Sequence, residues 1–343
     1  MIKKSKYSIV KCESVEKNLI IDFIKITSRP TYSEEIFNWQ YKNPKSSICC
    51  IKEEVQILGT QGMISVDLLF NQKTILSHKS ETTFIDDSLR GKGEFERLYD
   101  YSVNEAIHNE SKLIWGFTAL GTLWENKLHF KCDKELIFEA NLIVKPSNSI
   151  QGLKRVYYFF KGVQNRLKRL AISEKNLTIE KFNLSIEISS LNQFESTLSE
   201  KTVSLDYQSE TVKNRIFNSP VITYHYLRIH FLGNLEAVVI YHIAKNQFII
   251  SEFLYIDMDK LPSIVKKVIS YSFAQKNITN IRFWGNKKNE HYCAIFDNLS
   301  KFGCNIIPVH NMQLVYKPID ENLMEIDPSN YMINGLWTEG FTY

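Results

Sequence analysis

One turn of the sequence combines glycines and basic residues in a pattern that suits an anion. It reads Arg90-Gly91-Lys92-Gly93-Glu94-Phe95 and joins a predicted strand that ends near Ile85 to a predicted helix. Such a turn exposes backbone N–H groups, and the helix dipole places partial positive charge beside them. Glycines also let the backbone approach the anion closely. The turn therefore predicts a phosphate site, and the alternative is a tight turn that only starts a helix.

Other short motifs of nucleotide or metal chemistry are missing or have plainer explanations. The GxxxxGK[ST] spacing of a P-loop is absent, and Gly91 and Gly93 lack the third glycine of GxGxxG. No GxSxG nucleophile elbow occurs. The eight histidines include no HExxH motif and no other tight cluster, so metal catalysis has no support. The Asp257-Met258-Asp259 stretch matches the Asp-x-Asp of metal-dependent glycosyltransferases, but its position favours a turn at the end of a strand.

Two side chains on the strand before the glycine-rich turn suit proton transfer. Glu81 is the better placed candidate for a general base, and His78 is the second. The alternative for Glu81 is a solvated residue at the edge of a sheet. We therefore expect the catalytic groups to lie beside the predicted phosphate site.

The composition indicates a folded chain of about two domains, at roughly 150 residues per domain. The 343 residues are 44% hydrophobic, and 42 basic side chains nearly balance 38 acidic ones. This balance gives no indication of a DNA partner. The N-terminal residues lack the apolar run of a signal peptide, and no apolar stretch is long enough to span a membrane. We therefore expect a cytoplasmic protein.

The six cysteines follow no metal-binding spacing, so zinc and a disulfide framework are both unexpected. We expect reduced thiols, as is usual in the cytosol. The positions are Cys12, Cys49, Cys50, Cys132, Cys293 and Cys304.

Four pairs of short motifs recur in the same order, at offsets of 169 to 176 residues, which predicts an ancient duplication. The pairs are Trp39 to Pro44 with Arg215 to Pro220, Phe84 to Asp87 with Tyr255 to Met258, Ile114 to Gly116 with Phe283 to Gly285, and Phe130 to Cys132 with Phe302 to Cys304.

Each half also shows the same succession of two strands, a helix, a strand and a short helix. In the first half these are 57–69, 73–85, 94–109, 112–117 and 124–130; in the second they are 235–242, 247–257, 261–275, 278–284 and 296–302. The pattern predicts an α+β (mixed α/β) fold with two similar domains, each a twisted mixed sheet flanked by helices. We expect domains at 1–145 and 201–343, joined by a segment over 146–200.

The connecting segment is predicted to hold a basic amphipathic helix over 151–170. It contains six basic residues and no acidic one, with apolar residues at helical spacing. Such a helix can lie on an anionic membrane surface, which would bring the protein to a lipid-linked substrate. The alternative is a linking helix packed on one domain with a solvated basic face.

The glycine-rich turn resembles the [RQ]-x-x-G-x-[GA] loop of the GCN5-related N-acetyltransferases. Arg90 and Gly93 match the first two fixed positions, whereas Phe95 stands where glycine or alanine is usual. An Arg-Gly-Lys-Gly turn before a large apolar residue, with an aromatic segment such as Trp39 to Pro44, is similar to acyltransferases of bacterial surface-polysaccharide clusters. Tandem copies of this fold also occur in the FemABX-like transferases. The second half looks like a degenerate copy.

The resemblance implies how the chain would bind acetyl-coenzyme A or another acyl-coenzyme A. The turn from Arg90 to Phe95, Lys92 and Glu94 included, would hold the pyrophosphate. The backbone of Phe84 and Ile85 would bond the pantetheine arm, and the segment from Thr118 to Thr122 would follow the neighbouring strand. The family's usual general-acid tyrosine is absent, and Glu125 occupies its register.

The implied reaction is direct transfer of the acyl group to an amine, with backbone N–H groups stabilising the oxyanion. The acceptor would be a small or lipid-linked amine, such as an amino sugar in surface-glycan synthesis. Trp284, Trp337 and Glu339 are the candidates for the acceptor side, and the alternative is a core tryptophan and a packed tail. Two further alternatives stay open: a FemABX-like transferase that uses aminoacyl-tRNA, and a non-catalytic binding protein on a decayed fold.

Overall fold

The structure, a computed structural model, describes residues 6–12, 16–144, 176–182, 191, 194 and 198–337. The chain divides into two units, and neither is continuous in sequence. Unit 1 comprises Met1–Lys134, Ser209–Val221 and Asn311–Ile326; unit 2 comprises Glu135–Gln208, Ile222–His310 and Asp327–Tyr343. Each unit has its own mixed sheet flanked by helices, as the sequence predicted.

The sheet of unit 1 has the strand order β1-β2-β3-β4-β5-β15-β6. Neighbouring strands are antiparallel except for β4 and β5, which are parallel. The strands are β1 (Ser8–Lys11), β2 (Ser47–Glu53), β3 (Gln56–Phe70), β4 (Lys73–Ile85), β5 (Leu113–Thr118), β6 (Lys131–Asp133) and β15 (Gln313–Pro318). The helices are α1 (Lys17–Thr27), α2 (Glu34–Gln40), α3 (Glu94–His108), α4 (Gly121–Leu128), α7 (Glu210–Phe217) and α10 (Glu321–Met324).

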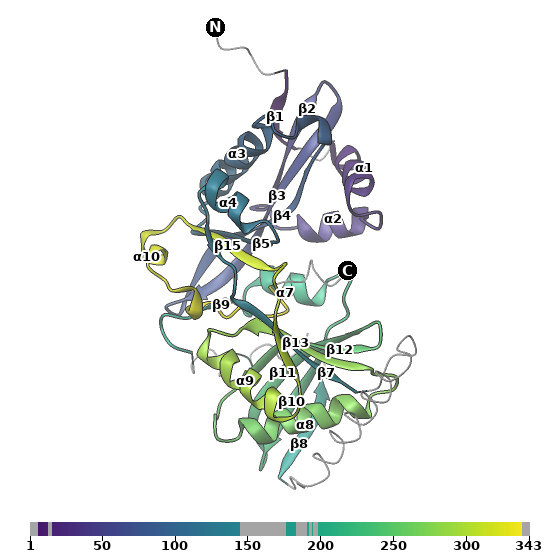
Figure 1. The fold of residues 1–343 in the computed structure, drawn as a ribbon, viewed down its shortest axis with the longest axis vertical. Helices are drawn as coiled ribbons and strands as arrows, with labels where there is room; N and C mark the ends of the chain where they lie inside the picture. The colour runs from purple at the N-terminus through teal and green to yellow at the C-terminus, as the bar shows by residue number, and fades with distance from the viewer. Residues whose placement is uncertain are drawn as a thin grey trace. The chain divides into compact units, whose positions relative to one another are not determined.

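Alternation along β2 explains why helices cover both faces of this sheet. Ile48 and Cys50 join the core under α1 and α2, whereas Cys49 and Ile51 join the core under α3. Figure 1 shows α1 and α2 on one face and α3 and α4 on the other. The helix α2 begins where the sequence signals it, because the Ser33 side chain caps the backbone N–H of Ile36 at 3.2 Å.

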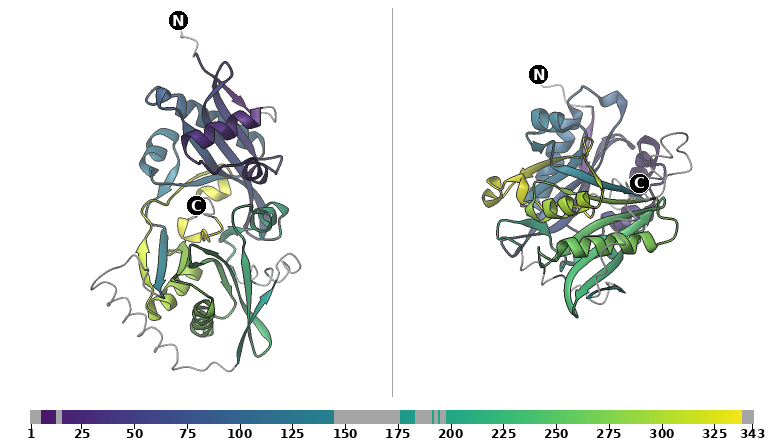
Figure 2. Two further views of the ribbon diagram at one scale, coloured as in Figure 1. Left: turned by 90° about the vertical axis from the view of Figure 1, so that its right-hand side faces the viewer. Right: turned by 60° about the horizontal axis from the view of Figure 1, so that its bottom comes forward.

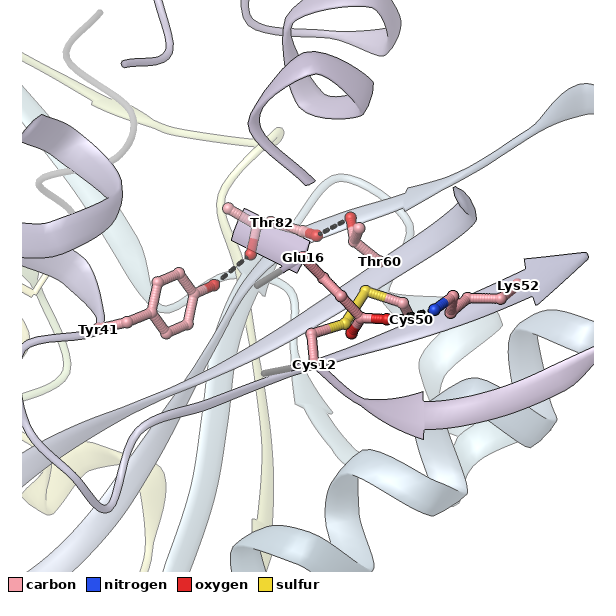
Figure 3. The surroundings of a disulfide bond; sticks show 7 residues. All are labelled: Cys12, Glu16, Tyr41, Cys50, Lys52, Thr60 and Thr82. Carbon is pink, nitrogen blue, oxygen red and sulfur yellow. Dashed lines mark hydrogen bonds and ion pairs between the residues drawn. A yellow bond between two sulfur atoms is a disulfide. The ribbon is translucent and has the colours of Figure 1, made fainter. Parts of the chain in front are cut away.

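The expectation of reduced thiols is wrong for one pair of cysteines. Cys12 and Cys50 form a disulfide, with their Cα atoms 6.3 Å apart (Figure 3). The two residues are 38 positions apart in sequence and meet because β1 and β2 are neighbours in the sheet. Cys49, the neighbour of Cys50, points to the opposite face and stays a thiol.

The sheet of unit 2 has the strand order β14-β7-β13-β12-β11-β10-β8, and β12 and β13 are its parallel pair. The strands are β7 (Ile137–Ile143), β8 (Leu177–Phe182), β10 (His225–Phe231), β11 (Asn234–Ala244), β12 (Gln247–Tyr255), β13 (Asn280–Asn286) and β14 (Asn305–Pro308). The helices α8 (Leu261–Ala274) and α9 (Glu290–Lys301) follow β12 and β13, and the short strand β9 covers Val203–Leu205. Pro262 lies in the first turn of α8, and Figure 2 shows α8 against one face of the sheet.

The two units repeat the same plan and exchange one strand each. Trp115 lies on β5 and Trp284 on β13, the equivalent strands of the two parallel pairs. The strand β7 lies at the end of the first half of the sequence but pairs with β13 and β14, whereas β15 lies late in the second half and pairs with β5 and β6. Because of this exchange and of α7, the units differ from the continuous domains that we expected.

The segment over 146–200 falls mostly outside the described residues, and so does the predicted basic helix over 151–170. Among the described residues, no helix is long and apolar enough to cross a bilayer.

Candidate functional site

A cleft opens in unit 1 where the parallel strands β4 and β5 separate. They pair only from Ser77 to Lys79 against Leu113 to Trp115. Just beyond, β4 has a bulge against β3, and Thr82 takes a left-handed backbone conformation with φ +50°. The hydroxyl of Thr60 donates to the carbonyl of Thr82 at 2.9 Å, and the hydroxyls of Tyr41 and Thr82 lie 2.6 Å apart (Figure 3). The bulge is thus fixed, and it turns the end of β4 away from β5.

A cavity of about 970 Å³ occupies this opening. Both strands, the glycine-rich turn, α3, α4 and the end of α1 contribute to its walls. Its apolar lining includes Phe84, Ile85, Leu89, Phe95, Phe117, Leu120, Leu123 and Trp124, and its remaining lining includes Thr27, Ser80, Thr83, Arg90, Gly91, Gly93, Glu96, Gly116, Thr118 and Lys127. A long cleft that joins apolar strand walls to a polar turn suits an extended ligand with an anionic end.

The turn at one end of the cavity has the backbone that the sequence predicted for an anion site. Gly91 and Gly93 have φ of +73° and +77°, and a Cβ at either position would meet no atom within 4 Å. The helix α3 starts after Gly93 without a side-chain cap, so its first turn offers backbone N–H groups to a ligand. The glycines are therefore required by conformation and leave open space beside the helix end.

Two cations and the acidic side chain of Glu96 line the cavity near the turn. Glu94, which opposes an anion on sequence grounds, is buried and pairs with Arg97 at 2.6 Å. Arg90 pairs with the exposed Asp87 at 2.7 Å, and Lys127 reaches Glu96 at 4.0 Å. Both cations line the cavity, and exposed pairs of this kind are weak enough to yield to a phosphate.

The equivalent opening in unit 2 is filled by the chain itself. The parallel strands β12 and β13 pair only from Gln247 to Ile250 against Asn280 to Phe283. Beyond that point Asn334 forms a bridge with Gly285, and the backbone N–H of Asn286 donates to the carbonyl of Ile333 at 2.9 Å. Because β7 occupies the other edge of β13, this segment lies on the edge that faces β12.

Close packing locks the segment 331–337 in this second opening. A Cβ on Gly335 would lie 2.9 Å from the Cα of Ser251 on β12, so glycine alone permits the contact. The turn before α8, residues 256–260, contains Asp257 and Asp259 and no glycine. Within the described residues, unit 1 therefore has a cleft with a phosphate-type turn, whereas residues 331–337 occupy the corresponding place in unit 2.

Comparison with solved structures identifies this architecture. A protein from Enterococcus faecalis, described as a probable N-acyltransferase, superposes with a TM-score of 0.66 at 10% identity, covering 94% of this chain and 75% of that one. A GCN5-related N-acetyltransferase from Kribbella flavida gives 0.62 at 4% identity, over 92% and 72%. The chain has the fold of the GCN5-related N-acetyltransferases. The Saccharomyces cerevisiae N-myristoyltransferase, solved with bound myristoyl-CoA, shares this acetyltransferase fold, with a TM-score of 0.55 at 10% identity over 92% and 83%.

The likeness is visible in structure alone. No family model matches the sequence, and no curated protein matches it either.

Most of the predicted cofactor residues of this acetyltransferase fold meet in the cleft. Phe84, Ile85, Arg90, Gly91, Gly93, Phe95 and Thr118 line the cavity, whereas Lys92, Glu94 and Thr122 do not. Phe95, which departs from the family motif, fills the cleft wall and packs beside Tyr99 at 6.0 Å between ring centres. The sequence analysis did not identify Trp124 and Lys127 as cavity residues. They are three residues apart on the short helix α4, a spacing that places both side chains on one face of the helix.

The two candidate bases lie beside the cavity and outside its lining. His78 is fully buried, its Nε2 lies 2.9 Å from the carbonyl oxygen of Lys45, and burial lowers its pKa. Glu81 is nearly buried, and Lys79 contacts it at 2.7 Å. Burial alone would raise the pKa of Glu81, but the charges of Lys79 and Arg29 outweigh it and hold that pKa at about 2. Glu81 therefore stays ionised at neutral pH.

The acceptor-side candidates are placed only in part. Trp284 is 6% exposed, with the Arg282 guanidinium 4.6 Å from its ring centre, and Trp337 is 1% exposed in the segment that fills the second opening. Glu339 lies outside the described residues.

Glu252 on β12 is fully buried among uncharged hydrogen-bond donors. It accepts from the hydroxyls of Tyr207 and Tyr292 and from the Nδ2 of Asn334. The backbone N–H of Phe253 donates to it as well, at 2.8 Å. Burial raises the pKa of Glu252 to about 7, although the bonds from Tyr207, Phe253 and Tyr292 lower it. This carboxyl anchors the segment that fills the second opening.

The raised pKa of Glu252 predicts a pH-dependent stability. The native protein keeps a proton that the unfolded chain releases near the ordinary value of 4.5, so stability falls as pH rises from 4.5 to about 7. The loss is at most roughly 3 kcal/mol. Glu252→Gln has no proton to release and is expected to match wild type at about pH 5 and to be the more stable protein at about pH 8 in urea unfolding. The exposed Glu200→Gln is the control, and an equal difference at both pH values would count against the buried neutral carboxyl.

Proposed function

We propose that the chain transfers an acyl group from coenzyme A to an amine. The observation that supports this most is the cavity of about 970 Å³ that runs from the separated strands to the turn of Gly91 and Gly93. In this proposal the turn and the first N–H groups of α3 hold the pyrophosphate, and Arg90 and Lys127 add positive charge. The backbone of Phe84 and Ile85 bonds the pantetheine arm along the free edge of β4.

The proposed reaction needs few groups. The deprotonated amine attacks the thioester carbonyl, the C–N bond forms, and the C–S bond breaks as the thiolate leaves and takes a proton. With its pKa at about 2 and its charge matched by Lys79, Glu81 binds protons weakly, so we do not assign it the storage of the acceptor's proton. The proton then passes to water. His78 is neutral and turned to the Lys45 carbonyl, which makes it the weaker candidate.

The acceptor that we propose is a small or lipid-linked amine, with an amino sugar of surface-glycan synthesis as the first to test. The direct assay follows release of the coenzyme A thiol from acetyl-coenzyme A with and without such amines. Amine-dependent release is the expected result. Binding of acetyl-coenzyme A without release by any amine would instead favour a binding protein, and release only with aminoacyl-tRNA would favour the FemABX-like alternative.

A further inference from the structure

A group of charged side chains lies beside the cleft, on the face of the first sheet that α1 and α2 cover. Lys79 Nζ is 2.7 Å from one carboxylate oxygen of Glu81, and Arg29 Nη2 is 3.5 Å from the other. Arg215 on α7 also lowers the pKa of Glu81 by its charge. Lys79 is 1% exposed and Glu81 is 9% exposed, so their short ion pair is shielded from water. The negative charge of Glu81 is thus balanced mainly by the ammonium group of Lys79.

Arg29 is not part of the cavity lining, but residues near it in sequence and residues near its partner Glu81 are. Thr27, two residues before it at the end of α1, lines the cavity, and so do Ser80 and Thr83 on either side of Glu81 in β4. The side chain of Arg29 is 31% exposed, and its contact with Glu81 is the longer of the two. A guanidinium presents five N–H donors in a planar fork, of which one long contact uses little. The remaining donors suit a carboxylate or a phosphate.

The second unit shows what the same position looks like without an open cleft. Glu252 precedes Tyr255 on β12 by three residues, as Glu81 precedes Phe84 on β4. Around Glu252 the hydrogen-bond donors are uncharged, and the segment 331–337 fills the opening. Among the residues that the structure describes, cations accompany this carboxylate in unit 1, whose cleft is open, and not in unit 2. The cations therefore stand in the unit in which a ligand has access to the cleft.

We propose that Arg29 binds an anionic group, a carboxylate or a phosphate, carried by the acceptor amine. This inference rests on the proposed function. Because the buried Lys79–Glu81 pair is already matched in charge, Arg29 is left to take the anionic end of the acceptor. The acceptor class is then an amine with an acidic group on the same small molecule. A neutral amine would leave the guanidinium without its ligand.

The test uses pairs of amines that differ only in the anionic group. Glycine is compared with glycinamide, and glucosamine 6-phosphate with glucosamine, by release of thiol from acetyl-coenzyme A. Wild type is expected to favour the anionic member of at least one pair by about tenfold or more in kcat/KM, mainly through KM. The pair that responds distinguishes a carboxylate from a phosphate. Arg29→Gln should reduce the preference to less than about threefold, and Arg29→Lys should retain part of it.

Two controls separate this role from a structural one. Lys25→Gln removes an exposed charge from the last turn of α1, shortly before Arg29, and should leave the preference unchanged. The affinity of Arg29→Gln for acetyl-coenzyme A should equal that of wild type. The inference is overturned if Arg29→Gln keeps the preference, if the neutral amines react equally well, or if acetyl-coenzyme A binds and no anionic amine reacts. Absence of acetyl-coenzyme A binding to wild type would instead overturn the proposed function, and the inference with it.

Discussion

A Gly93→Val variant is expected to bind acetyl-coenzyme A at least about a hundredfold more weakly than wild type. Gly93 precedes α3 at φ +77°, with open space where a Cβ would stand. A valine there puts its side chain in the space that the pyrophosphate needs. Losing two or three charge-assisted hydrogen bonds costs about 3–6 kcal/mol of binding free energy. Calorimetric titration of both proteins measures the difference.

A valine at a left-handed backbone position also causes strain, so the control variant must have the same strain at a position away from the cavity. Gly233, in the turn between β10 and β11 of unit 2, has φ +86° and equally open surroundings. Gly233→Val should therefore lose a similar amount of stability, about 1–3 kcal/mol, and keep wild-type affinity for acetyl-coenzyme A. Equal affinity of Gly93→Val and Gly233→Val would place the ligand elsewhere.

Glu81→Gln is expected to lower the free energy of unfolding by about 3–5 kcal/mol at neutral pH. The substitution leaves the ammonium of Lys79, which is 1% exposed, without its 2.7 Å partner. Urea unfolding measures the loss. The double variant Lys79→Gln/Glu81→Gln removes both charges and should recover most of the stability. A single variant as stable as wild type would contradict a buried ion pair at this position.

The lowered pKa of Glu81 also fixes the sign of its pH dependence. The native carboxyl holds its charge down to about pH 2, whereas the unfolded one takes up a proton near 4.5. The stability that this pair adds is therefore complete above pH 4.5 and is lost as the pH falls toward about 2.

Local sequence patterns predicted those parts of the site that are formed by residues close together in the sequence. The glycines of the turn, the start of α3 and the strands with Phe84 and Trp115 all depend on nearby residues, and the structure has them. The ordered motifs also predicted the repeated plan, because both copies keep their strand and helix succession.

The features that could not be predicted from the sequence depend on contacts between residues far apart in the chain. The exchange of β7 and β15 depends on which sheet edge each strand meets, and strand patterns do not encode partners. The Cys12–Cys50 disulfide follows from the pairing of β1 with β2. Arg29 reaches Glu81 across 52 residues, and Gly335 meets Ser251 across 84, so neither contact leaves a local signature.

Because the second opening is filled, the proposed function predicts how many molecules of acetyl-coenzyme A one chain binds. Unit 1 has the open cleft and the turn of Gly91 and Gly93, whereas residues 331–337 occupy the corresponding space in unit 2. Isothermal titration of the wild-type protein with acetyl-coenzyme A tests this directly. The account predicts saturable binding of one molecule per chain, abolished or strongly weakened in Gly93→Val. No binding at millimolar ligand, or two equivalent molecules per chain, would contradict it.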